Sequence, residues 1–460
     1  MDQTVHLNCQ GATALIEIDN PPVNALSQSV RAGILDALSR AEADPAIEVI
    51  ALMGRGKVFI AGADIREFGK PPKAPLLPDV IERLEQSEKA VIAILHGVAL
   101  GGGLEVALGC HYRIALMDTR LGLPEVNLGL LPGAGGTQRL PRLTGLKTAA
   151  EWITQGKLVS SETALETGLI DQVTMASSPH EAALEVAEQV RKGAVTRRRT
   201  GALANPKADT ESLDQLRQEL DRNSPELFSP FRILEALEAS CSLPLREGLK
   251  VERELFLQCM DSPQRAGLIH HFFASRAIGK VPGGEPVAEI EALILSGEHA
   301  IFEKLHDDPR VERVSASLPS IEVCLNSDSG ASVPTTCHVQ LIAEDAPINE
   351  SRFAFSLIKI PDTHWLELID HQAQPAVQQA LINLLRKAGC KVLPSKGNSI
   401  YRSLQASLTG TENSRSSLEQ AALQIVREGL CYRPDDLDVI AIEALGYPAH
   451  LGGPHFQASS

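Results

Sequence analysis

The chain has 460 residues, of which 43% are hydrophobic and 22% are charged, proportions typical of a globular protein with two or three domains. The formal net charge is −15, and this acidity argues against a nucleic-acid-binding protein, which usually carries a basic face. No apolar run is long and uncharged enough to span a bilayer, and the N-terminus lacks the basic start and apolar block of a secretory signal. We therefore expect a cytoplasmic protein without nucleic-acid or membrane partners.

Eight cysteines are scattered along the chain, and none form a CxxC pair. Several stand in apolar runs, as buried thiols do. We therefore expect neither a disulfide framework nor a metal site, and the pattern fits a reducing compartment.

Short apolar strands alternate with longer helical stretches in the first part of the chain. Residues 12–18, 49–53 and 90–95 are predicted to be strands. Residues 30–43 are predicted to be a helix that ends before Pro45, because the residue before a proline disfavours helical backbone. This alternation predicts an α/β fold.

The composition changes after the first part. Residues 196–240 are polar and contain three prolines, which predicts a linker and one helix. Helical periodicity returns at 249–255 and 266–278, and the Pro-Gly-Gly sequence at 282–284 then breaks the chain.

The last part of the chain is predicted to be a smaller α/β unit over residues 285–400. Residues 320–324 and 338–342 are its clearest strands, and residues 415–445 are predicted to form a helical tail.

A glycine-rich turn follows the strand that ends near Leu95. Gly101-Gly102-Gly103 leads into a predicted helix with Glu105 in its first turn. Glycines let a ligand approach the backbone, and the first amide N–H groups of a helix have no partner and carry partial positive charge. Such a turn can bind an oxyanion. A phosphate loop or a plain tight turn shares the pattern, but no GK[ST] follows it.

Two glutamates, Glu105 and Glu125, stand among apolar neighbours. A carboxylate in apolar surroundings costs free energy unless it has a partner or a role. Two carboxylates that share one water can divide the roles of base and acid between them. Taken singly, either one is also explained as an ordinary charge at a helix end.

Four segments in this order resemble one family. Residues 21–27 are similar to its N-terminal CoA loop, 61–65 to its oxyanion segment, and 101–105 and 123–125 to its two catalytic glutamate segments. Residues 1–195 are thereby identified as a member of the crotonase superfamily, also called the enoyl-CoA hydratase/isomerase family.

Within that superfamily the chain is most similar to the hydratase half of the bifunctional β-oxidation enzymes. Residues 107–115 and 141–145 carry this resemblance. Residues 262–276 resemble the helix that closes the hydratase site of those enzymes.

The resemblance implies a role for each residue of the site. The backbone N–H groups of Ala63 and Gly102 would hold the thioester oxygen and stabilise the enolate. Glu105 would deprotonate a water that attacks the β-carbon, and Glu125 would deliver a proton to the α-carbon from the same face, which makes the addition syn. Coenzyme A enters as part of the acyl-CoA substrate, and no further cofactor is required.

The resemblance also implies contacts with the substrate and its coenzyme A. Ala61 and Ile65 would lie along the adenine and pantetheine, with residues of the closing helix nearby. The implied contacts are Val23, Leu26, Ala61, Asp64, Ile65, Phe272, Arg276 and Lys280.

Residues 285–460 resemble a 3-hydroxyacyl-CoA dehydrogenase only in pieces. Segments 430–439 and 446–454 are similar to its final helical domain, but no G-x-G-x-x-G follows a strand in this region. Without that motif the pyrophosphate of NAD has no close backbone approach and no helix N-terminus to occupy. We interpret the region as a truncated, degenerate dehydrogenase half, and NAD is not expected.

The predicted fold is α/β: a crotonase spiral of ββα repeats, then a closing linker helix, then a smaller degenerate α/β and helical region. The predicted domains are a crotonase core (1–195), a helical linker with the site-closing helix (196–284), a remnant of the dehydrogenase α/β domain (285–405) and a helical C-terminal remnant (406–460).

The expected reaction is syn hydration of a 2-trans-enoyl-CoA to a 3-hydroxyacyl-CoA, without dehydrogenase activity. Retention of Glu105 favours hydration, since isomerisation needs only the carboxylate at Glu125. Two alternatives stay open: isomerisation of 3-enoyl-CoA or another reaction of the superfamily, and a non-catalytic acyl-CoA-binding or scaffold subunit that docks a thiolase. The fused closing helix favours a monomer.

Overall fold

The computed structural model describes residues 3–67, 70–195, 197–285, 287–288, 290–296, 300–305, 308–314, 320–325, 336–342, 348, 354–372, 374–409 and 414–459. The chain divides into two compact units, Met1–Arg265 and Ala266–Ser460. The division falls within the segment predicted to be a linker.

The first unit contains two sheets. A six-stranded sheet has the order β1-β2-β3-β4-β6-β9, in which only β1 and β2 pair antiparallel. A three-stranded sheet has the order β5-β7-β8. The strands are β1 (Val5–Gln10), β2 (Thr13–Ile18), β3 (Val49–Gly54), β4 (Ala90–Leu95), β5 (Val98–Leu100), β6 (Tyr112–Leu116), β7 (Arg120–Gly122), β8 (Leu158–Ser160) and β9 (Gln172–Thr174).

Successive strand pairs divide between the two sheets. The strand β4 belongs to the large sheet and β5 to the small one, and the helix α3 follows them. In the same way, β6 belongs to the large sheet and β7 to the small one. This is the predicted spiral of ββα repeats. The predicted strands at 12–18, 49–53 and 90–95 are confirmed as β2, β3 and β4, and every residue of β3 is buried, as its unbroken apolar run predicts.

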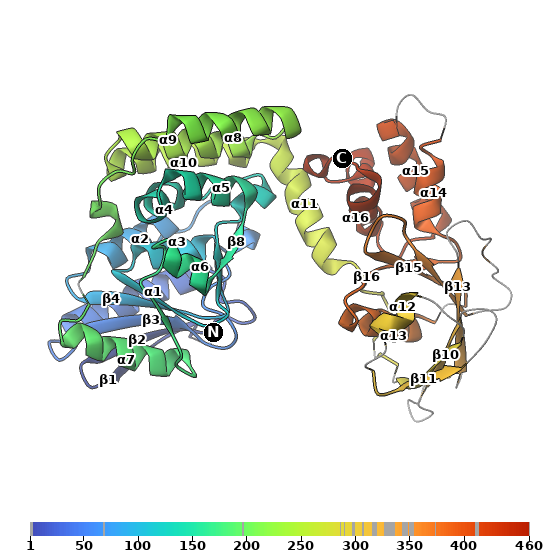
Figure 1. Cartoon of the computed structure of the whole chain (residues 1–460), viewed down its shortest axis with the longest axis horizontal. Helices are drawn as coiled ribbons and strands as arrows, with labels where there is room; N and C mark the ends of the chain where they lie inside the picture. The colour runs from blue at the N-terminus through green and yellow to red at the C-terminus, as the bar shows by residue number, and fades with distance from the viewer. Residues whose placement is uncertain are drawn as a thin grey trace. The chain divides into compact units, whose positions relative to one another are not determined.

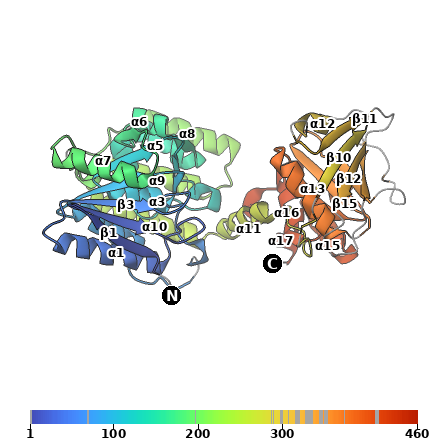
Figure 2. The ribbon, with the colours of Figure 1, turned by 90° about the horizontal axis from the view of Figure 1, so that it is seen from below.

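Helices cover both faces of the large sheet (Figure 2). The helix α1 begins at Gln28 and ends at Ala43, before Pro45 as predicted, and its buried face belongs to the main apolar core of the unit. The helix α7 packs its alanines and Val186 against the opposite face. The first helices are α1 (Gln28–Ala43), η1 (Ile65–Glu67), α2 (Leu77–Gln86), α3 (Gly102–Gly109), η2 (Glu125–Leu128), α4 (Gly136–Thr144), α5 (Leu146–Gln155), α6 (Ser161–Glu166) and α7 (Pro179–Arg191).

Three further helices complete the first unit: α8 (Thr210–Asn223), α9 (Ser229–Ser242) and α10 (Leu245–Asp261), preceded by η3 (Thr200–Ala202). Figure 1 shows α9 and α10 side by side over α4 and α5, in agreement with their contacts. The prediction of one helix and a linker at 196–240 was wrong, because this stretch contains α8 and most of α9. Pro230 lies in the first turn of α9, where a backbone N–H has no acceptor within the helix. The N–H that proline lacks is therefore not needed there, and Pro230 is compatible with the start of this helix.

The second unit has one mixed sheet in the order β11-β10-β12-β13-β14-β15-β16. The predicted strands at 320–324 and 338–342 are confirmed as β12 and β13. The strands are β10 (Ile290–Ser296), β11 (Val311–Val314), β12 (Ser320–Leu325), β13 (Thr336–Ile342), β14 (Phe355–Lys359), β15 (Trp365–Asp370) and β16 (Lys391–Lys396).

The helices of the second unit include the predicted helical tail, which Gly429 interrupts with a positive φ of 71°. The helix α13 packs on β15 and β16. The helices are α11 (Pro263–Ala277), within which the division between the units falls, α12 (Ala300–Lys304), α13 (Pro375–Lys387), α14 (Ile400–Ala406), α15 (Ser414–Glu428), α16 (Pro434–Leu445), η4 (Ala449–Leu451) and α17 (Pro454–Ser459). Across the described part of the chain, no helix has both the length and the apolar character needed to cross a membrane.

Candidate active site

Three segments of the first unit start from one edge of the small sheet. Strands β5 and β7 pair in parallel, and an isolated parallel bridge joins Ile60 to Ala99 of β5. Parallel neighbours end at the same edge of a sheet. The segments that follow these strands therefore begin at the same edge of the small sheet. They are residues 61–65, 101–105 and 123–125. These are the segments in which the sequence placed the site.

The predicted oxyanion amides lie next to each other. A Cβ built on Gly102 would stand 3.4 Å from the backbone nitrogen of Ala63. The Ala63 segment is held by Leu26, whose N–H donates to the Gly62 carbonyl at 3.0 Å. Within the described residues neither Ala63 N nor Gly102 N has a hydrogen-bond acceptor. Two free donors at this point can bind one oxygen atom of a ligand.

The helix that carries Glu105 starts earlier than the sequence indicates. It begins at Gly102 with Gly101 as N-cap, so the second and third glycines are already part of the helix. A Cβ on Gly103 would stand 2.3 Å from the Ile60 carbonyl oxygen. The third glycine therefore serves close packing inside the first helical turn, and Glu105 keeps its predicted place in that turn.

Glu105 is buried, with 3% of its surface exposed. Its Oε1 accepts hydrogen bonds from the backbone N–H groups of Ala134 at 2.8 Å and Gly136 at 2.9 Å. Burial raises the pKa of Glu105 above its ordinary value, while the two amides and the positive charge of Arg139 oppose that rise. These donors favour the ionised form, which is the form a base needs.

Glu125 faces the same glycine turn from the short helix η2. A Cβ on Gly101 would stand 2.9 Å from Glu125 Oε1, so a side chain at Gly101 would displace the carboxylate. The residue as a whole is half-buried, but its Oε2 is enclosed and has no hydrogen-bond partner in the described part of the chain. Burial, and then the charge of Glu105, raise the pKa of Glu125 well above its ordinary value.

The two carboxyl groups therefore have different environments beside one turn. Glu105 has two amide donors, whereas Glu125 Oε2 has none within the described residues and Glu125 is repelled by the charge of Glu105. When environments separate the pKa values of a carboxyl pair, the lower one supplies a base and the higher one an acid. The arrangement can thus take a proton at Glu105 and give one at Glu125.

A third buried carboxylate, Glu252 of α10, was missed by the sequence analysis. Its Oε1 accepts from Gly135 N at 2.6 Å, and its Oε2 accepts from Thr137 N at 2.9 Å and Thr137 Oγ1 at 2.5 Å. Burial, and then the nearby Glu105, raise the pKa of Glu252 to about 8. One signal was present: Glu252 falls in the buried row Gly248, Glu252, Leu255, Cys259 of α10, where helical spacing calls for an apolar residue.

The predicted CoA-binding residues of the first unit differ in exposure. Val23 is 42% exposed, and Ala61 N donates to its carbonyl at 3.1 Å, whereas Leu26 is fully buried. The Asp64 carboxylate is already bound to Arg66, at 2.8 Å between Arg66 Nη2 and Oδ2, and this pair holds the pKa of Asp64 below its usual range. Ile65 begins η1, and its side chain lies outside the described residues. Their contacts with coenzyme A stay predictions.

Phe272, Arg276 and Lys280 belong to the second unit. The Arg276 guanidinium lies over the Phe272 ring, 3.2 Å from its centroid, a cation–π contact within α11. Their predicted contact with coenzyme A, and the closing of the site by this helix, stay predictions.

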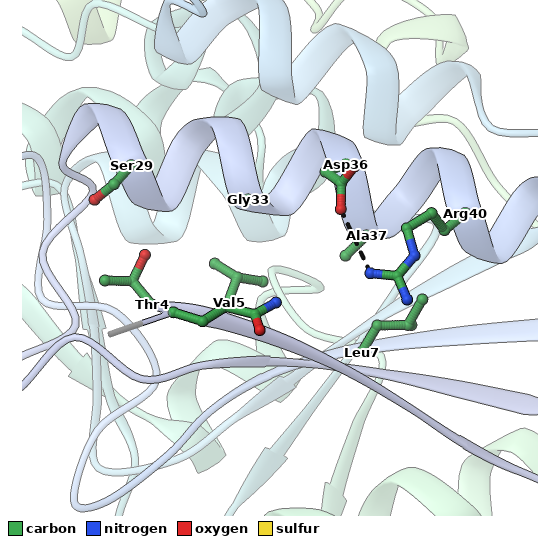
Figure 3. Close-up of a pocket in the computed structure, with 9 residues that line it drawn as sticks. Thr4, Val5, Leu7, Ser29, Gly33, Asp36, Ala37 and Arg40 are labelled. Atoms are coloured by element: carbon green, nitrogen blue, oxygen red, sulfur yellow. Dashed lines mark ion pairs between the residues drawn. The ribbon is translucent and has the colours of Figure 1, made fainter. Parts of the chain in front are cut away.

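Two other features of the described residues are separate from the glutamates. A cavity of about 220 Å³ lies between β1 and α1, bordered by Thr4, Ser29 and the ion pair of Asp36 with Arg40 (Figure 3). None of the predicted site residues lines it.

In the second unit, His270, Asp435 and Asp438 could converge on a cation. Asp438 already accepts hydrogen bonds from His455 N at 2.7 Å and Phe456 N at 3.2 Å, and it pairs with His270 at 2.8 Å. These contacts account for the cluster as a structural one. The expectation that the protein needs no metal stays a prediction.

Residues 8–225 match the family model described as Enoyl-CoA hydratase/isomerase. This match confirms the predicted resemblance of this part of the chain to the crotonase superfamily.

The chain is similar to two curated proteins that are each named peroxisomal bifunctional enzyme. The one from Danio rerio is 43% identical over 279 residues, which are 59% of this chain and 38% of that protein. The one from Homo sapiens is 41% identical over 275 residues, 58% of this chain and 38% of that protein. The crystal structure of an enoyl-CoA hydratase from Bacillus anthracis is 27% identical, covers 59% of this chain and 96% of that chain, and has a TM-score of 0.39.

The match spans well under half the length of the two curated relatives. It confirms the predicted resemblance to bifunctional enzymes, while the degenerate dehydrogenase half and the monomeric state stay predictions. Both relatives are named peroxisomal, so the predicted cytoplasmic location finds no support in them.

Proposed function

We propose that the first unit adds water in syn geometry to the double bond of a 2-trans-enoyl-CoA and forms a 3-hydroxyacyl-CoA. The observation that carries this proposal is the pair Glu105 and Glu125. Both lie beside Gly101–Gly103, one with amide donors and the other without a donor to its Oε2 in the described residues. The family match of residues 8–225 supports the acyl-CoA substrate.

The reaction divides between the two carboxyl groups and the free amides. The thioester oxygen accepts hydrogen bonds from Ala63 N and Gly102 N, which draws electrons away from the double bond. Ionised Glu105 takes a proton from water as the water oxygen bonds to the β-carbon, and the electron pair of the double bond moves into the enolate.

Protonated Glu125 then completes the addition by giving its proton to the α-carbon, and the enolate collapses to the thioester. Glu105 now holds the proton that came from water, and Glu125 is ionised. Transfer of one proton from Glu105 to Glu125 restores the starting state. Both groups act from the side of the glycine turn, so hydroxyl and hydrogen add to one face.

The first prediction concerns the two glutamates. Glu105→Gln and Glu125→Gln keep the side-chain shape but cannot exchange the proton, so each should lower kcat on 2-butenoyl-CoA by about 100-fold or more. The measurement is the loss of absorbance of the conjugated thioester. Glu254→Gln is the matched control, because Glu254 is an exposed residue on α10. Near wild-type rates in both site variants would rule out the proposal.

A substrate panel separates the open alternatives. Turnover of 3-butenoyl-CoA without turnover of 2-butenoyl-CoA would indicate an isomerase. Tight binding of acyl-CoA without turnover of either would indicate a binding or scaffold subunit. The proposal expects rapid hydration of the 2-enoyl ester.

The second prediction concerns NAD. We propose that residues 285–460 oxidise no 3-hydroxyacyl-CoA, because no G-x-G-x-x-G motif stands there to receive the pyrophosphate. Incubation of the full chain with 3-hydroxybutanoyl-CoA and NAD should produce no absorbance of NADH. A steady rate of NADH formation would show that the dehydrogenase half is intact.

A further inference from the structure

Four consecutive backbone amides at the start of α4 bind two carboxylates in alternation. Ala134 N and Gly136 N donate to Glu105, while Gly135 N and Thr137 N donate to Glu252. Alternate amides of this turn point in opposite directions, so one segment lies between a carboxylate from α3 and a carboxylate from α10. Each carboxylate fixes the backbone that the other one uses.

We propose that Glu252 is a positioning residue of the hydration reaction: it holds residues 134–137 so that two of their amides orient Glu105. This inference rests on the proposed function. The family model matches residues 8–225, so Glu252 lies outside that match. The carboxylate that holds residues 134–137 therefore comes from a part of the chain that the family model does not cover.

The packing of α10 gives Glu252 little freedom. A Cβ on Gly248 would stand 2.1 Å from Gln138 Oε1, and one on Gly133 would stand 2.5 Å from the Phe256 ring. Residues 248, 252 and 256 follow each other at one-turn intervals, so a single face of α10 lies against the segment from Gly133 to Gln138. Glu252 stands in the middle of that face, and it is 1% exposed.

The charged groups around Glu252 come from three other elements, α3, η2 and α4. Glu105 on α3 acts on Glu252, and Glu252 in turn raises the pKa of Glu125 on η2. Arg139 on α4 acts on Glu105 with the opposite sign. Above its own pKa of about 8 Glu252 is ionised, and its negative charge then helps to keep the proton on Glu125, the proton that the reaction delivers.

The test compares Glu252→Gln with wild type and with the control Glu254→Gln on 2-butenoyl-CoA. The Gln side chain retains one acceptor but directs an NH₂ group at an N–H donor, so residues 134–137 should shift. We expect kcat to fall by about 100-fold, as small misplacements of a catalytic group do. KM should change less than about twofold, since no predicted CoA contact is altered.

The pH profile distinguishes positioning from mere support of the fold. Without the charge of residue 252, the pKa of Glu125 should fall, so the alkaline limb of the kcat profile should move to lower pH. A variant that was only less well folded would lose activity without moving this limb. Wild-type kcat and an unmoved alkaline limb in Glu252→Gln would overturn the proposal.

Thr137→Val decides the question where Glu252→Gln does not fold. It leaves every carboxylate in place and removes the hydroxyl donor to Glu252. The same hydroxyl accepts from Gln138 Nε2, which keeps its hydrogen bond to the Ala236 carbonyl at 2.7 Å. A lower kcat with unchanged KM is expected, and wild-type kcat would overturn the proposal.

A crystal structure keeps the failure of the proposed function apart from the failure of this inference. In Glu252→Gln the hydrogen bonds from Ala134 and Gly136 to Glu105 should lengthen or break, whatever reaction wild type performs. Absence of hydration by wild type would contradict the proposed function alone. Unchanged hydrogen bonds from Ala134 and Gly136 to Glu105 in Glu252→Gln would contradict the positioning role.

Discussion

At the scale of single residues, the site places a carboxyl group where ionisation is costly. Glu125 Oε2 is enclosed without a hydrogen-bond partner among the described residues, and Glu105 lies near enough to raise its pKa. A group of this kind lowers stability in its charged form. Its retention is explained by the protonated form, which can give a proton to a substrate.

The third prediction follows from this cost. The pKa of Glu125 is raised on folding, so between its unfolded and folded values the native state holds a proton that the unfolded chain releases. Its contribution to stability is therefore largest at low pH and is lost as the pH rises through the folded value. Residue 125 cannot ionise in Glu125→Gln. The free energy of unfolding of this variant relative to wild type should therefore increase with pH, by about 1.4 kcal/mol for each unit by which the pKa of Glu125 is raised.

Urea unfolding at pH 5 and pH 8 measures this difference. The exposed change Glu254→Gln should give the same difference from wild type at both pH values. If the free energy of unfolding of Glu125→Gln relative to wild type were no higher at pH 8 than at pH 5, the raised pKa of Glu125 would be contradicted.

At the scale of secondary-structure elements, Arg113 of β6 joins the end of α3 to the strand β9. Its guanidinium is fully buried and donates to the carbonyls of Leu169 and Cys110, both at 2.9 Å. It also pairs with Asp171 at 3.2 Å. Cys110 directly follows α3, the helix that carries Glu105, so the hydrogen bond from Arg113 to the Cys110 carbonyl holds the end of that helix.

The fourth prediction concerns this pair. Arg113→Met keeps most of the apolar stem but leaves the buried carbonyls of Leu169 and Cys110 without their donor. It also removes one of the two arginines that pair with Asp171, the other being Arg198 at 2.7 Å, so the free energy of unfolding should fall by about 3–5 kcal/mol. Urea denaturation measures it. Arg217→Met removes the partner of Glu238 in an exposed pair and should cost about 0–1 kcal/mol. Equal losses of unfolding free energy in Arg113→Met and Arg217→Met would show that the burial of an ion pair does not determine how much it contributes to stability.

At the scale of the whole molecule, each of the two units has its own apolar cores. The clusters of the first unit consist of residues up to Cys259, and those of the second unit begin at Ala274. The predicted oxyanion amides, Ala63 N and Gly102 N, and the three carboxylates all belong to the first unit. A unit with its own core can fold alone.

The fifth prediction is that a fragment of residues 1–265 folds and hydrates 2-butenoyl-CoA. Its unfolding in urea, followed by circular dichroism, should be a single cooperative transition. If Phe272, Arg276 and Lys280 bind coenzyme A as predicted, KM of the fragment should exceed that of the full chain while kcat is kept. A fragment without cooperative unfolding would show that the first unit depends on the second.

The sequence alone determined the strands β2, β3 and β4 and the helix α1, because apolar runs and prolines act locally. The stretch 196–240 was less predictable, since prolines both end and begin helices and only packing onto α4 and α5 shows which. Glu105 and Glu125 were found through their segment motifs, which the parallel pairing of β5 with β7 brings to one edge.

The tertiary structure alone decided which groups surround those glutamates. Glu252 meets Gly135 across 117 residues of chain, and no local pattern specifies a partner at that distance. Helical spacing shows that a charge points into the protein, but the packing of a second helix determines what it meets there. Donor, charge and burial around a carboxyl group depend on such distant neighbours, so the division between base and acid is a property of the folded chain.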